Sequence, residues 1–155
     1  MRLYLVRHGK AEQLGGEWER PLTARGQRDI IRMAAYLDKV DCRVTRIVHS
    51  GRMRARQTAE LLSGAIGPQG RVEEMRDGLQ PDDGTYLLAR AAAGWNDDVM
   101  AVGHQPFMGR MAAELLCGNP EVPLLVVKTG TVICLERIGD GAWSLRWMMA
   151  PSMVA

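Results

Sequence analysis

The chain has 155 residues, of which 46% are hydrophobic and 25% are charged, and its formal net charge is +2. This size and balance fit one globular unit, and we expect residues 1–155 to form a single domain. The small net charge and the aromatic content of 5% exclude a strongly basic or base-stacking nucleic-acid binder.

The three cysteines lie far apart, and no C-x-x-C pair occurs. This spacing argues against a disulfide framework and a zinc knuckle, and it favours reduced thiols in a cytoplasmic protein. No apolar run is long enough to cross a bilayer, and the first residues do not have the pattern of a signal peptide. We therefore expect no membrane association.

The first half of the chain alternates apolar runs with helical patterns. Leu3–Val6 is predicted to be a buried strand, and residues 13–21 form a polar, glycine-rich loop. Thr23 is a good N-cap for a helix in which Ile30, Ala34 and Leu37 recur at helical spacing. The remaining elements predicted here are a strand at Val44–Val48 and a helix from a cap at Ser50 to about Leu62, ended by Gly64, Gly67, Pro68 and Gly70.

The second half begins in the same way and then changes to consecutive strands. A short edge strand at Arg71–Glu73, a loop over 77–84 and a helix over 85–93 are predicted first. They are followed by a strand at Val99–Val102 and a helix to Leu116, with Gln105 as its N-cap and Pro106 as its first residue. The last predicted strands are Leu124–Val127, Thr131–Glu136 and Trp143–Met148, the final two joined as a hairpin through Gly139–Gly141.

This order of elements predicts an α/β fold. Alternating strands and helices give an open, mostly parallel central sheet with helices on both faces, and the final strands add an antiparallel extension. The expected architecture is a three-layer α/β/α sandwich in a minimal form, without a large lid insertion.

Three predicted strands end in residues that suit an anion site. They are followed by Arg7, His8 and Gly9, by His49 and Ser50, and by Gly103, His104 and Gln105, respectively. Ligands bind at the carboxyl ends of parallel strands, so these loops are expected to meet at one edge of the sheet. Helices that start after Ser50 and Gln105 would point free N–H groups at an anion.

The residue types at these strand ends predict phosphoryl chemistry. A neutral ring nitrogen of His8 can attack phosphorus, and His104 can stabilise the transferring group, more strongly if protonated. Arg7 and Arg54 can each grip phosphate oxygens through paired N–H groups. On the predicted helix Arg54 points away from Arg52 and Arg56, which we interpret as rim or surface charges. By contrast, we give His49, Asp77, Asp82 and Asp83 ordinary structural interpretations.

Four segments, in this order, resemble the histidine phosphatase superfamily, also called the phosphoglycerate mutase-like family. They are Leu5–Gly9 (R-H-G), Arg20–Thr23 with Gly26 (L-T-x-x-G), Ser50–Thr58 (S-x-x-x-R-A-x-Q-T) and Val102–Pro106 (G-H-x-P). The resemblance covers nearly the whole chain. It implies a cofactor-free, metal-independent phosphatase in which His8 becomes phosphorylated while Arg7, Arg54 and His104 hold the phosphate. Arg20 is a further candidate for substrate binding.

Within the superfamily, the short chain, the Arg20–Thr23 segment and the ending Trp147–Pro151 resemble the small SixA-type phosphohistidine phosphatases. That resemblance implies a phosphohistidine-bearing signalling protein, such as a phosphotransfer domain, as partner. The alternative is a small-molecule phosphomonoesterase acting on a sugar or nucleotide phosphate.

The length of Arg71–Gly84 bears on this choice. Ester hydrolysis expels an alkoxide, which needs a proton from a positioned acid, whereas phosphohistidine releases imidazole, a far better leaving group. Larger relatives supply the acid from an insertion, and Arg71–Gly84 is too short for a helical lid. Its carboxylates match no motif, which leaves open whether Asp82 or Asp83 acts as the acid.

Lys10 departs from the resemblance, because family members commonly carry an acidic or amide residue after the R-H-G motif. Its charge would favour an acidic substrate or, as we expect, point into solvent. Two other classes remain as alternatives. One is a phosphate-binding module without turnover, and the other is a metallohydrolase using His8, His49 and His104, which no H-E-x-x-H spacing supports.

Overall fold

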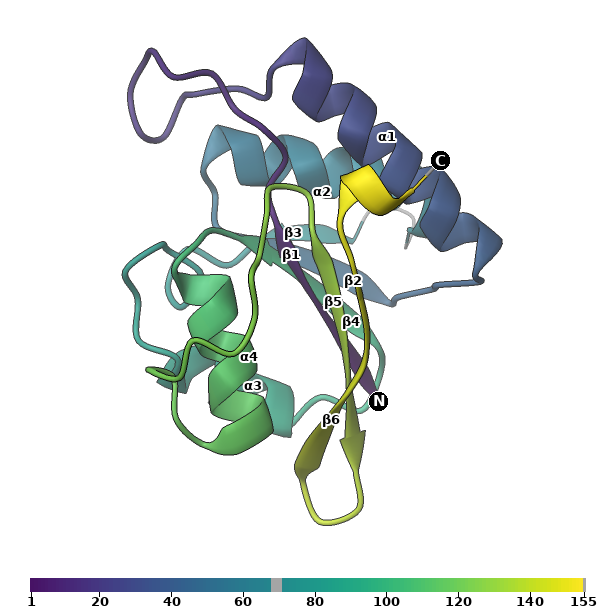
Figure 1. Ribbon diagram of the computed structural model, residues 1–155, viewed down its shortest axis with the longest axis vertical. Helices are drawn as coiled ribbons and strands as arrows, with labels where there is room; N and C mark the ends of the chain where they lie inside the picture. The colour runs from purple at the N-terminus through teal and green to yellow at the C-terminus, as the bar shows by residue number, and fades with distance from the viewer. Residues whose placement is uncertain (68–70, 155) are drawn as a thin grey trace.

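The computed structural model describes residues 1–67 and 71–154, and its centre is a sheet of six strands (Figure 1). The strands are β1 (Arg2–Arg7), β2 (Arg46–His49), β3 (Val72–Glu74), β4 (Val99–Gly103), β5 (Val132–Ile138) and β6 (Ala142–Met149). The helices are α1 (Ala24–Lys39), α2 (Met53–Ile66), α3 (Tyr86–Ala93) and α4 (Phe107–Cys117), followed near the C-terminus by the 3-10 turn η1 (Pro151–Met153).

The order of strands in the sheet is β3-β2-β4-β1-β5-β6. The first four in this order are parallel, and β5 and β6 run antiparallel to their neighbours. The prediction of a mostly parallel sheet with an antiparallel extension is therefore confirmed. Because β1 lies between β4 and β5, the residues after Arg7 emerge at the middle of the sheet edge.

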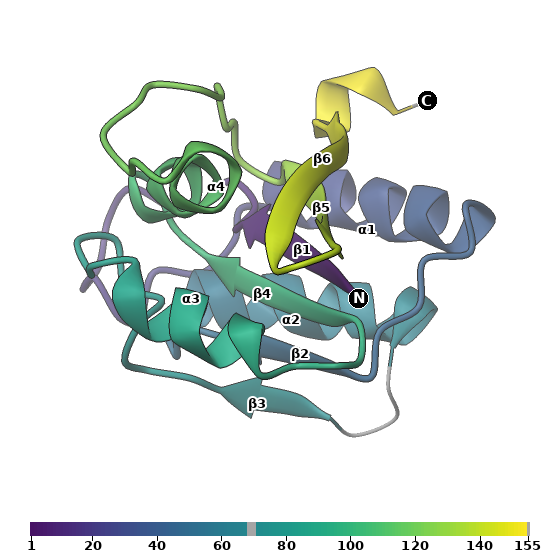
Figure 2. The ribbon, with the colours of Figure 1, turned by 90° about the horizontal axis from the view of Figure 1, so that it is seen from below.

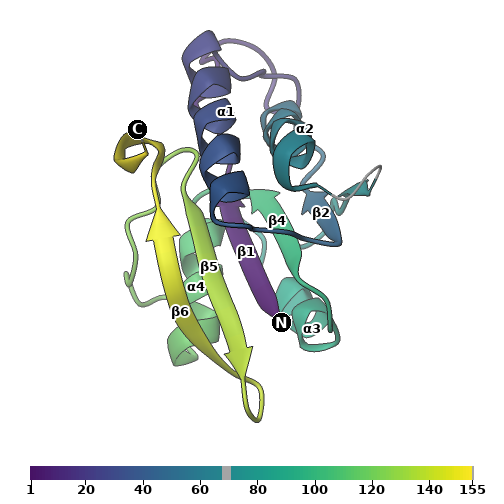
Figure 3. The same cartoon turned by 90° about the vertical axis from the view of Figure 1, so that its right-hand side faces the viewer.

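Helices cover both faces of the sheet, as Figures 2 and 3 show. The side chains of α1 and α2, including Ile30, Leu37 and Leu62, form one apolar core with alternate residues of the strands. Those of α3 and α4, including Leu88 and Phe107, form a second core against the opposite face. The three-layer α/β/α sandwich is confirmed, and the described residues contain no large insertion.

The predicted start of α2 was wrong. The helix begins at Met53 rather than after a cap at Ser50, because the Ser50 hydroxyl is hydrogen-bonded to the His104 ring at 2.6 Å. The helix also continues through Gly64 and ends at Ile66, before Gly67. Pro68 and Gly70, which were expected to help end it, lie outside the described residues.

The strand predicted at Leu124–Val127 does not form. The Val127 carbonyl accepts a hydrogen bond from Arg7 Nη1 at 2.8 Å rather than from a neighbouring strand. Leu124 and Val126 are exposed in the loop between α4 and β5. This short apolar run therefore belongs to a loop and not to the sheet.

One smaller prediction needs adjustment, and another is confirmed. Helix α4 begins at Phe107, one residue later than expected, so Pro106 rather than Gln105 is its N-cap, and the Gln105 side chain accepts the Gly109 N–H at 2.7 Å. The predicted hairpin between the last two strands is confirmed, and its turn contains Gly139 and Gly141 at positive φ. In the part of the chain that is described, no helix is both long and apolar enough to cross a bilayer.

Candidate active site

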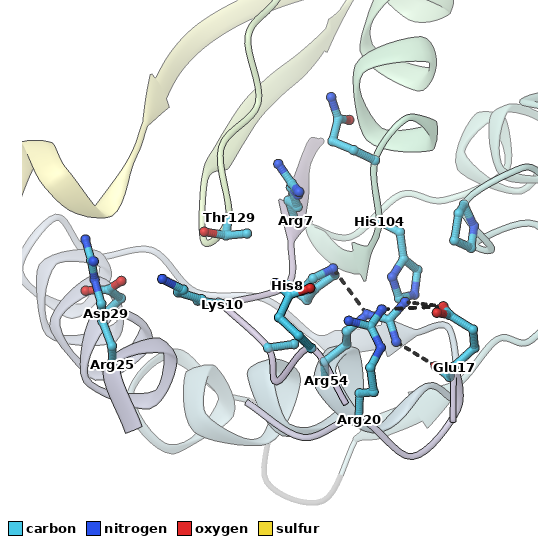
Figure 4. Close-up of a pocket in the computed structure, with 14 residues that line it drawn as sticks. Arg7, His8, Lys10, Glu17, Arg20, Arg25, Asp29, Arg54, His104 and Thr129 are labelled. Atoms are coloured by element: carbon cyan, nitrogen blue, oxygen red, sulfur yellow. Dashed lines mark hydrogen bonds and ion pairs between the residues drawn. The ribbon is translucent and has the colours of Figure 1, made fainter. Parts of the chain in front are cut away.

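A cavity of about 600 Å³ opens at the carboxyl ends of β1 and β4 (Figure 4). Its lining includes all five of the predicted site residues, which are Arg7, His8, Arg20, Arg54 and His104. They come from the end of β1, the following loop, the first turn of α2 and the end of β4. The structure therefore brings together at one place residues that the sequence separates by up to about a hundred positions.

The His8 ring is buried and held in one tautomer. Its Nδ1 lies 2.6 Å from the Gly9 carbonyl oxygen, which can only accept, so Nδ1 carries the proton. The other nitrogen, Nε2, is unprotonated, and its lone pair accepts a long hydrogen bond from the Arg54 Nε–H at 3.4 Å. Burial, reinforced by the positive charges of Arg54 and Arg7, lowers the pKa of His8 to about 4. The imidazole is thus neutral and nucleophilic at neutral pH.

His104 lies with its ring centroid 5.0 Å from that of His8. Its Nε2 is 2.6 Å from the Ser50 hydroxyl, which also accepts the Arg52 N–H. A hydroxyl that donates to Nε2 leaves the proton on Nδ1. Burial lowers the pKa of His104 to about 2, so the isolated protein offers a neutral N–H to the transferring group. A phosphoryl dianion beside the ring would raise this pKa.

Three buried nitrogen donors around the cavity have no hydrogen-bond partner among the described residues. They are Nε of Arg7, Nε of Arg20 and Nδ1 of His104. Leaving a buried donor unpaired costs free energy, and most buried donors in proteins are paired. Three such donors on the lining of one cavity suit a ligand rich in acceptor oxygens, such as a phosphoryl group.

Glu17, in the loop after β1, is a cavity residue that the sequence analysis missed. Its carboxylate pairs with Arg52 at 3.1 Å and with Arg20 and Arg54 at 3.4 Å each, while its backbone carbonyl accepts from Arg54 Nη1 at 2.6 Å. Arg20, followed by Arg54 and Arg52, lowers the pKa of Glu17. No motif marks this residue, and only the excess of arginines around the site indicates that a counter-charge is needed.

The neighbouring Trp18 fixes this loop to the start of α2. Its ring lies between the guanidinium groups of Arg52 and Arg76, each 4.7 Å from the ring centroid, and its carbonyl accepts the Met53 N–H at 2.8 Å. Arg52 is therefore a rim residue with structural contacts. Arg56, by contrast, is an exposed surface charge paired with Glu60.

The Gln and Thr positions of the S-x-x-x-R-A-x-Q-T segment connect α2 to the loop after β1. The Thr58 hydroxyl accepts the Gly9 N–H at 3.0 Å and donates to the Arg54 carbonyl at 2.7 Å. The Gln57 side chain accepts the Leu22 N–H at 2.8 Å. The motif thus links α2 to the loop that follows β1 at two points.

The remaining predicted residues have clear places. His49 is structural as expected, because its Nδ1 accepts the Gly51 N–H at 3.1 Å. The Asp83 carboxylate accepts the N–H groups of Gly78 and Gln80, and the exposed Asp82 does not line the cavity. Lys10 is exposed and also lies on the cavity lining.

Comparison with known proteins bears on this site directly. The model of the histidine phosphatase superfamily (branch 1) matches residues 3–79, which contain the R-H-G segment and the Arg54 helix. The phosphohistidine phosphatase SixA of Escherichia coli K12 is 26% identical over 155 residues, covering 97% of this chain and 94% of SixA. The chain belongs to the histidine phosphatase superfamily.

Solved structures of other phosphatases share this fold. A structure of the protein histidine phosphatase SixA complexed with tungstate has a TM-score of 0.88 at 25% identity, covering 98% of both chains. The fold also matches a putative α-ribazole-5′-phosphate phosphatase of E. coli, with a TM-score of 0.75 at 19% identity over 97% of both chains. As a histidine phosphatase, the protein is an enzyme of a metal-independent class.

Proposed function

We propose that this histidine phosphatase hydrolyses phosphohistidine in a partner protein, such as a phosphotransfer domain. The observation that carries the proposal concerns the carboxylates. Among the described residues only Glu17 and Asp29 bring a carboxylate to the cavity lining. Arginines lower the pKa of Glu17, and Asp29 pairs with Arg32 at 2.8 Å. Neither is suited to protonate an alkoxide, so a substrate with a good leaving group fits best.

The proposed reaction has two steps. Nε2 of His8 attacks phosphorus as the P–N bond of the substrate breaks, and the departing imidazole nitrogen takes up a proton from solvent. Water then attacks phospho-His8, which releases inorganic phosphate and restores the neutral ring. Arg7, Arg20, Arg54 and His104 act by holding and stabilising the equatorial oxygens, because phosphoryl transfer depends mostly on positioning and electrostatics.

The depressed pKa of His8 serves the first step. An unperturbed histidine would be partly protonated near pH 6.5 and would lose its nucleophilic lone pair. With a pKa of about 4, the ring stays neutral throughout the physiological range. The hydrogen bond from Nδ1 to the Gly9 carbonyl orients Nε2 and strengthens as positive charge develops on the ring.

The competing function is hydrolysis of a small phosphate ester. It stays an alternative because the fold also matches that of a putative α-ribazole-5′-phosphate phosphatase. A direct comparison of kcat/KM separates the two. We expect a phosphohistidine-bearing phosphotransfer domain to be dephosphorylated with a kcat/KM at least ~100-fold above that of sugar and nucleotide phosphates, since only the esters need an acid worth ~100-fold or more. A higher kcat/KM for any ester would overturn the proposal.

The role of His8 has a separate test that does not depend on the natural substrate. Rapid acid-free quenching of the wild type with phosphorylated substrate should trap acid-labile phosphate on the protein. The His8→Ala variant should trap none and should lose measurable turnover, because nothing replaces the nucleophile. His49→Gln is the matched control, since His49 lies outside the cavity lining and should leave trapping intact. Equal labelling of the His8→Ala variant would contradict the assignment.

The proposal also includes a cytoplasmic location. Cys42 and Cys134 are buried free thiols, and Cys117 is an exposed free thiol. Such thiols suit a reducing compartment.

A further inference from the structure

The cavity extends beyond the residues that hold the phosphoryl group. Figure 4 shows Lys10, Arg25 and Thr129 on the side away from Arg54 and Glu17, with His8 between the two groups. Pockets of several hundred Å³ hold ligands of drug size, so a cavity of about 600 Å³ leaves most of its space free when a phosphoryl group is bound. Something larger than phosphate can therefore be recognised here.

The charges of the lining do not balance. It carries five cationic side chains and two carboxylates. Both carboxylates have other partners, because Glu17 pairs with Arg20, Arg52 and Arg54, and Asp29 pairs with Arg32. Within the described residues, Lys10 and Arg25 make no ion pair. These two cations remain available to a ligand.

Lys10 and Arg25 come from segments that are fixed against each other. The Lys10 carbonyl accepts two hydrogen bonds from Thr23, one from the Thr23 N–H at 2.9 Å and one from the Thr23 hydroxyl at 3.3 Å. A Cβ added to Gly26 would lie only 2.1 Å from the same carbonyl oxygen, so only glycine permits this approach of α1. The first turn of α1, which contains Arg25, is thereby held beside Lys10.

We propose that Lys10 and Arg25, with the Thr129 hydroxyl opposite them, form a second anion subsite that binds a carboxylate of the substrate next to its phosphoryl group. If the proposed function holds, this carboxylate belongs to an acidic side chain close to the phosphohistidine of the partner protein. The inference rests on the proposed function in this respect. A carboxyl group on a small phosphorylated metabolite has the same chemistry. The subsite makes the enzyme selective for acidic substrates and leaves the phosphoryl chemistry to His8.

The test compares two phosphohistidine peptides that differ by one Glu-to-Gln replacement beside the phosphohistidine. A second pair, 3-phosphoglycerate and glycerol 3-phosphate, differs by a carboxylate in a small molecule. The wild type should prefer the acidic member of a pair by about tenfold in kcat/KM, and salt should reduce this preference. A preference for the acidic peptide over its Gln counterpart points to a protein substrate. A preference for 3-phosphoglycerate over glycerol 3-phosphate points to a small-molecule substrate.

The variant to compare is the double substitution Lys10→Met with Arg25→Gln, which should bring the ratio of kcat/KM values within a pair to about one. Its matched control is Lys39→Met with Arg28→Gln, which removes the same charge from exposed positions of α1 off the cavity lining and should retain the ratio. A double variant that keeps the wild-type preference, or a wild type without preference in either pair, would overturn the subsite. Failure to hydrolyse phosphohistidine would refute the proposed function alone, because the metabolite pair still reports on the subsite.

Discussion

Single residues set the balance of charge in this site. Arg54 Nε lies near the His8 ring, its Nη1 is bound to the Glu17 backbone, and its Nη2 faces the Glu17 carboxylate. A bound phosphoryl group therefore shares Arg54 with Glu17. The same carboxylate sets how tightly the product phosphate is held, because like charges on one guanidinium repel each other.

Removing this charge should strengthen product binding. We expect Glu17→Gln to lower the inhibition constant of inorganic phosphate by about two- to fivefold, the size typical of exposed charge interactions. Inhibition kinetics at several phosphate concentrations provide the measurement. Glu19→Gln is the matched control, since Glu19 is exposed and does not line the cavity. Unchanged or weaker phosphate inhibition in the Glu17 variant would contradict the competition.

At the residue scale, the sequence predicted His8, Arg7, Arg54, His104 and Arg20 because each belongs to a motif at an expected strand or helix end. Glu17 was missed because its position depends on ion pairs with α2 and on the packing of Trp18 between Arg52 and Arg76. Those contacts join a loop to residues more than thirty positions away, and no local pattern encodes them. The sequence left the protonation state of His104 open, because that state follows from burial.

Among the secondary-structure elements, α2 has the largest part in assembling the site. It supplies Arg54 to the cavity, and Thr58 one turn later joins the helix to the loop after β1. The helix thus aligns two site residues, His8 and Arg54, that come from different elements. Sequence patterns predicted the helix but misplaced its start, since the Ser50 hydroxyl is bound to His104 instead of capping it.

The link through Thr58 can be removed without changing the size of the side chain. Thr58→Val leaves the buried Gly9 N–H without an acceptor, which should lower the free energy of unfolding by about 1–3 kcal/mol. Because the Gly9 carbonyl orients His8, we also expect kcat to fall by about tenfold or more. Urea unfolding and steady-state kinetics measure the two effects. Thr58→Ser retains the hydroxyl and should restore both, whereas an unaltered kcat in the valine variant would argue against this alignment.

On the scale of the whole molecule, the buried histidines couple stability to pH. The folded-state pKa of His8, about 4, lies below that of an exposed histidine, so the unfolded chain binds a proton more readily. The stabilisation is therefore present at neutral pH and is lost as the pH falls below about 6.5. His8 alone should account for a loss of about 2 kcal/mol between pH 7 and pH 5.

Chemical denaturation at a series of pH values tests this coupling. The wild type should lose about 2 kcal/mol more of its unfolding free energy between pH 7 and pH 5 than the His8→Asn variant, which has no ring to protonate. Equal losses in the two proteins would show that His8 is not held neutral. The comparison is independent of catalysis, because it uses the protein without substrate.

The overall architecture followed from the sequence because strands, helices and turn residues all pointed to the same α/β order. The exception, the absent strand at Leu124–Val127, shows where such reasoning ends. Its run of four apolar residues is typical of a strand, but Leu124 and Val126 are exposed and the Val127 carbonyl is bound to the Arg7 side chain. Those contacts are properties of the assembled molecule, and a single segment does not reveal them.

The central place of β1 has a consequence for synthesis on the ribosome. Leu3 pairs on one side with Val99 and on the other with Leu135, so the first strand to emerge obtains both partners only from segments translated much later. Until then its apolar residues have no sheet to join, and such strands invite association with other chains or capture by chaperones. Phosphatase activity thus appears late and as a unit, because no nascent fragment that ends before β4 contains His104.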